Sequence, residues 1–151
     1  MKTVLGFSIG IAIMYVIGTL TPVPTQAANV GDVQRIYNKI LAANPGIKVV
    51  PIEVKRDIYS WCSEACNTGT RIYVSIEALS DVRNEDELAG LIGHEEAHFV
   101  FKDEMKADVL GLNYAAKAGY NYCVAAQILK SYEGDDVHPV GSIRYANTGC
   151  L

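Results

Sequence analysis

Residues 84–98, NEDELAGLIGHEEAH, constrain the fold more than any other stretch of the chain. Asn84 followed by Glu87 three positions later is typical of a capping box, so a helix is expected to begin at residue 85. Apolar residues recur in and just after this stretch at the three- and four-residue spacing of a buried helix face: Leu88, Leu91, Ile92 and Phe99. We therefore predict a helix over residues 85–101 with one face in the core.

His94 and His98 lie four residues apart, which places them on one helix face about 6 Å apart. Two imidazoles at this spacing can bind one zinc ion, and Glu95 can reach a zinc-bound water without binding the metal itself. The pattern predicts His94 and His98 as zinc ligands and Glu95 as general base, as in a zinc peptidase. The alternative is a surface helix with two solvated histidines, which the neighbouring apolar stripe disfavours.

A hydrolytic zinc site takes three protein ligands and a water, so a third ligand is expected downstream. The candidates are His138 and the downstream carboxylates, among which Glu104 and Asp108 lie four apart at the start of a second predicted helix. One of these acids could bind the metal while the other orients a ligating histidine. They could equally be two solvated acids, which the dipole favours at a helix N-terminus.

The spacing between His98 and Glu104 sets a condition on this site. In a continuous helix, Glu104 would point about 240° away from His98 and lie about 9 Å further along the axis. A shared metal therefore requires the helix to break near residues 101–103, although no glycine or proline marks a break there.

The rest of the chain predicts a small sheet followed by helices, and so one α+β domain. Strands are predicted over residues 47–54, 57–61 and 71–76, with turn composition over residues 62–69. Besides residues 85–101, helices are predicted over residues 30–43, from Glu104 to a cap at Gly119, and over residues 122–132 with Asn121 as the N-cap; residues 135–151 have loop composition. An edge strand of this sheet could bind an extended peptide, or the strands could only cover the helices.

The four cysteines indicate two disulfides, because an even number in a small exported domain usually pairs. Three pairings are possible, and the simplest joins Cys62 to Cys66 and Cys123 to Cys150. The second bond would tie the tail to a helix and contribute about 3.5 kcal/mol of stability in the chain-entropy model. Metal binding by Cys62 and Cys66 is the alternative, which their spacing and the lack of a nearby histidine disfavour.

Residues 1–27 resemble a signal peptide, with Lys2, an apolar run over residues 4–20 and small residues before Ala28. Cleavage would leave a mature domain of residues 28–151 in a bacterial periplasm or outside the cell. Alternatively, residues 4–20 stay as an N-terminal membrane anchor, and only then is the membrane a partner. The formal net charge of −4 and the absence of a basic cluster argue against nucleic acid as a partner.

Several motifs, taken in order, resemble the HtpX-like and CAAX-prenyl-protease-like zinc metallopeptidases, the gluzincins of peptidase family M48. These motifs are Asn84-Glu85-Asp86-Glu87-Leu88-Ala89, Gly93-His94-Glu95-Glu96-Ala97-His98, Glu104-Met105-Lys106-Ala107-Asp108 and His138-Pro139 followed by Arg144. The chain departs from the family in the short connection before Glu104 and in carrying two cysteines ahead of Ile72.

The resemblance implies a small zincin-like α+β domain, in which a short mixed sheet packs on the HExxH helix and a following glutamate-bearing helix. It implies one zinc ion per chain, bound by His94, His98 and Glu104, with Glu95 as general base. Asp108 would orient a ligating histidine, and Arg144 and His138 would support the transition state. A lone histidine before a proline, as at His138, is also typical of a surface loop.

These observations favour an exported zinc endopeptidase that acts on proteins or peptides. The first alternative is an exported, zinc-stabilised binding or inhibitor domain without turnover. The second is an interaction protein held by disulfides and without a metal.

Overall fold

The computed structural model describes residues 28–150 except 57, 60, 61, 63, 136 and 137. The predicted signal peptide, residues 1–27, lies outside the described residues. So do three positions of the strand predicted over residues 57–61, and the two described positions, Ile58 and Tyr59, are not in a strand.

The described chain forms an α+β domain, as the sequence predicts. Its elements are, in order, α1 (Val30–Ala43), β1 (Ile52–Lys55), β2 (Ala65–Asn67), β3 (Ile72–Ser75), α2 (Ile76–Asp81), α3 (Glu85–Ala97), α4 (Glu104–Lys117), α5 (Tyr122–Ala125), the 3-10 helix η1 (Ala126–Ser131) and α6 (Gly141–Asn147). The sheet is short and mixed, with strand order β1-β3-β2, β1 parallel to β3 and β2 antiparallel to it.

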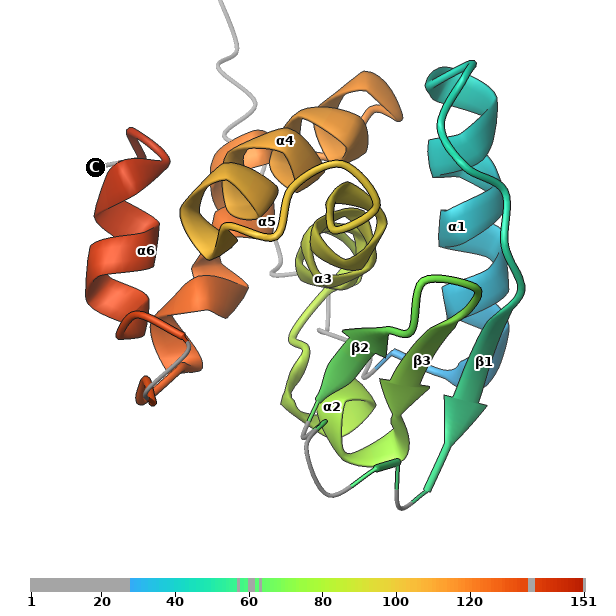
Figure 1. The fold of residues 1–151 in the computed structure, drawn as a ribbon, viewed down its shortest axis with the longest axis horizontal. Coiled ribbons are helices and arrows are strands. Elements are labelled where there is room, and N and C mark those ends of the chain that lie inside the picture. Colours follow the sequence, from blue (N-terminus) through green and yellow to red (C-terminus); the bar gives the residue numbers. More distant parts are fainter. Residues whose placement is uncertain (1–27, 57, 60–61, 63, 136–137, 151) are drawn as a thin grey trace, which may run out of the picture.

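Helix α3 runs through the middle of the molecule, with α1 and the sheet on one side and α4, α5 and α6 on the other (Figure 1). Its residues from Glu87 to Ala97 are all buried. A Cβ atom at Gly93 would overlap the carbonyl oxygen of Gly111, and one at Gly111 would overlap the backbone nitrogen of His94. The two glycines therefore let the backbones of α3 and α4 touch beside the first histidine.

The helix starts follow the predicted caps. The Asn84 side chain accepts a hydrogen bond from the Glu87 amide at 3.0 Å, and Asn121 caps α5 in the same way. The Glu87 carboxylate does not return to Asn84 as in a full capping box. It accepts from the Arg83 amide at 2.9 Å instead.

The break between the first two site helices is confirmed and falls slightly earlier than predicted. Helix α3 ends at Ala97 with His98 as its C-cap, so residues 98–101 of the predicted helix lie outside it, with residues 98–100 in a turn. The next helix begins at Glu104 because Asp103 caps it, accepting from the Lys106 amide at 2.9 Å. An N-cap aspartate thus starts the second helix without a glycine or proline to end the first.

Four other predictions need correction. The strand predicted over residues 47–54 is only Ile52–Lys55, because it begins after Pro51, which cannot donate to a ladder. Residues 65–67, within the predicted turn, pair with β3, and helix α2 was not anticipated. The helix predicted over residues 122–132 is a short α-helix followed by a 3-10 helix, and residues 141–147, predicted as loop, form α6.

Two disulfides connect the described cysteines in the simplest of the three pairings. Cys62–Cys66 closes the loop before β2, and Cys123–Cys150 ties the segment after α6 to α5. Both bonds fit an exported protein in an oxidising compartment. Within the described residues, every helix is too short or too polar to cross a membrane.

Candidate metal centre

Three side chains meet where α3 ends and α4 begins. The Nε2 atoms of His94 and His98 lie 2.9 Å apart. The Glu104 carboxylate faces both rings, with Oε2 3.3 Å from His94 Nε2 and Oε1 3.4 Å from His98 Nε2. One ligand atom from each of the three residues therefore lies within 4.8 Å of the others, a group that could hold a metal ion.

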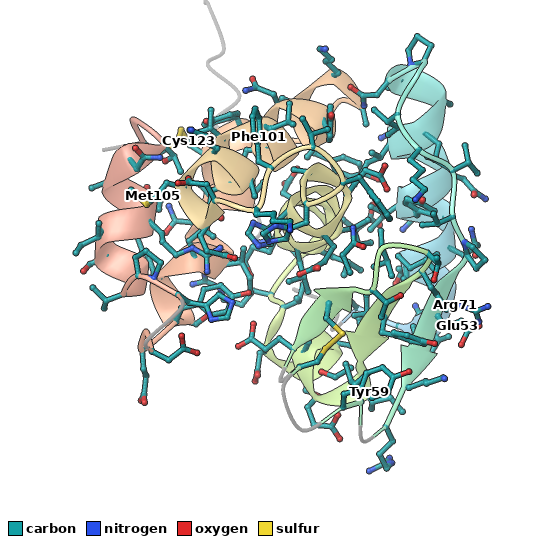
Figure 2. All side chains as sticks on the ribbon, viewed as in Figure 1. Glu53, Tyr59, Arg71, Phe101, Met105 and Cys123 are labelled. Atoms are coloured by element: carbon teal, nitrogen blue, oxygen red, sulfur yellow. A yellow bond between two sulfur atoms is a disulfide. The ribbon has the colours of Figure 1, made fainter. Side chains whose placement is uncertain are left out.

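The turn between the helices brings Glu104 back to the histidines. Because α3 stops at Ala97, the chain reverses through residues 98–103 instead of carrying Glu104 further along one axis. The turn also holds the second ring, since His98 Nδ1 lies 3.0 Å from the carbonyl oxygen of Phe101 (Phe101 is labelled in Figure 2). The condition that the sequence set on a shared metal is met.

The first histidine is held by a buried chain of charged groups. His94 Nδ1 lies 2.9 Å from Asp108 Oδ1. Arg144 donates two hydrogen bonds to the Asp108 carboxylate, from Nε at 2.8 Å and from a terminal nitrogen at 2.6 Å. The Asp108 and Arg144 side chains are 0% and 2% exposed, so Asp108 is not a solvated acid at a helix start.

With these contacts made, the two histidine Nε2 atoms and the Glu104 carboxylate face one another and could bind a cation. If each Nδ1 carries the proton and donates it to its acceptor, each Nε2 presents a lone pair toward Glu104. Among the described residues, buried Glu104 Oε2 is one of the side-chain oxygens without a hydrogen-bond partner. A tetrahedral zinc ion with ligands at about 2.0–2.1 Å separates neighbouring ligand atoms by about 3.4 Å, close to the distances here. The three residues therefore fit zinc.

Without a metal, a proton takes the place of that cation. Burial lowers the pKa of His94, but the interactions with the nearby carboxylates of Asp108, Glu104 and Glu95 outweigh it and raise the pKa to about 9. Burial also lowers the pKa of His98, and the charge on His94 adds to that effect. The surroundings of His94 thus favour a positive charge, which a proton or a metal ion could supply.

Glu95 lies on α3 next to the first histidine and is buried, with 5% of its surface exposed. Burial and the charge of Glu104 outweigh the lowering effect of His94 and together raise the pKa of Glu95 to about 7. A carboxyl group with a pKa near neutrality can both accept and return a proton, which is what a general base needs. The sheet also contacts Glu95, because the Asn67 side chain in β2 donates to the Glu95 backbone carbonyl at 2.8 Å.

The two candidate residues nearest the C-terminus, His138 and Arg144, both lie beside Glu104, one partly exposed and the other buried. His138 is in a loop, with its side chain 43% exposed, yet its Nε2 lies 3.8 Å from Glu104 Oε1. Its Nδ1 contacts Asp135 at 3.0 Å. Arg144 is buried on α6, and one guanidinium nitrogen lies 3.5 Å from Glu104 Oε2.

One residue of the site was missed by sequence reasoning. The ring of Tyr132 lies against the Arg144 guanidinium, 4.7 Å from centroid to Cζ, and lines a small cavity with His94 and Asp108. Tyr132 sits at the end of a predicted helix in no motif, so its role depends on tertiary contacts that the pattern does not encode.

Comparison with known proteins supports the geometry in one respect. The family model of Peptidase family M48 matches residues 27–105, just over half of the chain, and this match includes both histidines, Glu95 and Glu104. Comparisons with curated proteins and with solved structures found no match. Asp108, His138 and Arg144 lie beyond the matched residues and are placed at the site by the fold alone. On the family match, this chain belongs to peptidase family M48.

Proposed function

We propose that this protein is an exported zinc endopeptidase in which His94, His98 and Glu104 hold one zinc ion and Glu95 is the general base. Membership of the family implies a zinc metallopeptidase that acts on protein or peptide substrates. The observation that carries the residue assignments is the convergence of two imidazole nitrogens on the Glu104 carboxylate, whose buried Oε2 has no hydrogen-bond partner.

The residues around the site divide the chemistry between them. Bound zinc supplies Lewis acidity and makes a water easier to deprotonate. Glu95 accepts the proton of the attacking water and passes it to the leaving amine. Asp108 holds the proton on His94 Nδ1, and Arg144 keeps Asp108 ionised and adds positive charge beside Glu104. His138 at the rim can donate a hydrogen bond to the oxygen on which negative charge develops.

The outer edge of β2 is the place where we expect an extended substrate to bind. Ser75 donates to the Glu64 carbonyl and Thr68 donates to the Arg71 carbonyl, so Glu64 and Thr68 use their main-chain groups on the β3 side. The main-chain N–H and C=O groups point to opposite sides at successive residues of a strand. The groups of Ala65 and Asn67 therefore point to the outer side, where an added strand could pair with them.

The opposite edge of the sheet is less suited to this role. It belongs to β1, where Glu53 pairs with Arg71, and both residues lie on the far side of the sheet from α4 (Figure 2). Charged pairs of this kind are typical of strand edges that do not accept another strand. Substrate binding along β2 would instead place the peptide beside Glu95, because Asn67 already contacts its carbonyl.

Export is proposed from two features, the disulfides and the N-terminal segment. The two disulfides support export. Cleavage after residue 27 would release residues 28–151 into the periplasm or the medium, whereas an uncleaved segment over residues 4–20 would keep them at a membrane surface.

The test measures zinc content and hydrolysis of fluorescein-labelled, unfolded casein by the purified protein and three variants. We expect one zinc per chain in the wild type and in Glu95→Gln, with hydrolysis lost in that variant. Glu104→Ala should lose both zinc and activity, and Glu77→Gln, at an exposed position of α2, is the matched control. Zinc retained in Glu104→Ala would remove Glu104 as a ligand. Zinc without hydrolysis in the wild type would favour the binding domain, and a folded protein without zinc would refute the proposal.

A further inference from the structure

The Asn67 side chain joins the edge strand β2 to the helix that carries the proposed general base. Its Nδ2 atom donates to the backbone carbonyl of Glu95 at 2.8 Å, and its Oδ1 atom accepts from the Gly69 amide at 2.6 Å. A backbone amide can only donate and a carbonyl can only accept. The two partners therefore fix which way the side-chain amide of Asn67 points.

The Glu95 carbonyl needs a donor from outside its own helix. It lies in the last turn of α3, where helix carbonyls lose their usual partners. The amide four residues further on belongs to Phe99, and it donates to the Glu96 carbonyl at 3.2 Å instead, because α3 ends at Ala97. Asn67 thus supplies the bond that the helix does not make, and it fixes the peptide unit of the general base to the sheet.

The end of β2 that carries Asn67 is itself firmly held. The Thr68 amide donates to the Arg71 carbonyl at 3.0 Å, which closes the turn between β2 and β3. Gly69 makes this turn with a φ of 84°, and its carbonyl accepts from the Lys48 side chain at 2.6 Å. Asn67 therefore contacts α3 from a tight and supported turn.

Asn67 also lies on the path that we expect for a substrate. Its main-chain groups, like those of Ala65, point to the outer edge of β2, because Thr68 next to it uses its own groups on the β3 side. Figure 1 shows β2 beside α3, and the two elements pack together. If a peptide adds to this edge, the residue that pairs with the peptide backbone also holds the backbone of Glu95.

We propose that Asn67 is a positioning residue that sets the place of Glu95 relative to a peptide bound along β2. This inference rests on the proposed peptidase function and deepens it, because it names what aligns the base with the substrate. Pairing with the peptide uses the main chain of β2, so substrate binding should survive the loss of the Asn67 side chain. Proton transfer is more sensitive, since a misplacement of about 1 Å can cost about 100-fold in rate. Removing the donor should therefore lower kcat about 10- to 100-fold and change KM by less than about threefold.

The experiment measures kcat and KM for labelled casein with the full-length protein carrying zinc. Asn67→Asp keeps the oxygen that Gly69 binds and removes the donor to Glu95, whereas Asn67→Ala removes the whole amide without adding a charge. Asn113→Asp is the matched control, because the Asn113 side chain also donates to a helix carbonyl, that of Val109 at 2.7 Å, on the exposed side of α4. Zinc content and thermal unfolding of each protein show whether the centre and the fold are intact.

A second measurement separates binding from turnover. In the Glu95→Gln background, where we expect casein to bind without being cleaved, adding Asn67→Ala should leave the casein Kd unchanged. A role limited to supporting the substrate strand would instead weaken binding in this background.

A lower kcat in both Asn67 variants, with KM, casein Kd and zinc content close to those of the wild type, supports the positioning role. A higher KM at unchanged kcat overturns it, and so do unchanged values of both or a loss of zinc. If Asn67→Ala does not fold, Asn67→Asp decides alone. Hydrolysis by the wild type leaves the peptidase assignment standing in each of these cases. If the wild type binds zinc and cleaves no casein, the proposed function fails and the inference on Asn67 fails with it.

Discussion

Asp108→Asn tests how far the metal centre depends on residues that do not touch the metal. The substitution keeps the size of the side chain and one oxygen that can accept from His94 Nδ1, now 2.9 Å away. It removes the charge that opposes Arg144, whose guanidinium is buried and bound by two hydrogen bonds to this carboxylate. Burial raises the pKa of Asp108, but Arg144 and His94 outweigh this effect and lower it, so the native group is ionised.

Two separate losses are expected. Removing the carboxylate behind a ligating histidine typically weakens metal binding by about 10- to 100-fold, or about 1.4–2.7 kcal/mol. Removing one partner of a buried ion pair costs about 3–5 kcal/mol of unfolding free energy, a large share of a typical domain's stability. The Arg144 guanidinium, no longer paired with a carboxylate at position 108, can pair with Glu104 Oε2, 3.5 Å away, and then competes with the metal for this ligand.

Competition with a chromophoric chelator near neutral pH measures the zinc Kd, and urea unfolding in zinc-free buffer measures stability. The double variant Asp108→Asn with Arg144→Met should recover part of the lost stability without recovering zinc affinity, because it removes the unpaired charge but not the need for a carboxylate. Asp103→Asn is the matched control, since asparagine caps a helix as well as aspartate does. An unchanged zinc Kd in Asp108→Asn would refute the idea that this carboxylate orients His94.

Three further predictions follow from other contacts. Gly93→Ala should push α3 from α4, because its methyl group would overlap the Gly111 carbonyl; we expect a loss of about 1–3 kcal/mol in unfolding free energy and weaker zinc binding, measured by urea unfolding and chelator competition. Replacing Cys123 and Cys150 together by alanine should lower the unfolding free energy by about 3.5 kcal/mol with a smaller effect on zinc affinity than Asp108→Asn, and equal stability would contradict this. Because burial raises the pKa of Glu64 above its ordinary value, its contribution to stability is complete below that ordinary value and is lost as pH rises through the raised one. The unfolding free energy of Glu64→Gln relative to the wild type should therefore increase from acidic to neutral pH, and a pH-independent difference would contradict the shift.

The parts of the fold that local sequence determines were predictable. Asn84 and Asn121 cap helices where the sequence places them, and the spacing of His94 and His98 puts their rings together at the end of one helix. The need for a break before Glu104 also follows from helix geometry alone, and Asp103 supplies it. In each case the interacting residues are at most a few positions apart, so the sequence pattern contains the interaction.

The parts that failed depend on partners distant in sequence. Residues 65–67 have turn composition and become a strand because β3 provides the partner and a disulfide closes the loop before them. Residues 141–147 form a helix whose sequence is weakly apolar, and Arg144 within it is buried by its bonds to Asp108. The contact of the Tyr132 ring with the Arg144 guanidinium likewise joins two residues that no local pattern relates.

This difference between local and distant contacts explains how a small domain can hold the proposed metal centre. The three candidate ligands come from residues 94–104 and are set by one helix end, one turn and one N-cap. Their orientation is not local, because Asp108 reaches His94 across the α3–α4 contact and depends in turn on Arg144 from α6. Helix α6 is itself held by Asn147, which donates to the Met105 carbonyl at 3.2 Å, and the segment after it by the bond between Cys123 and Cys150. A substitution that loosens the C-terminal segment should therefore weaken zinc binding by disturbing the orientation of His94 first. His98 should be affected less, because its ring is held by the turn itself.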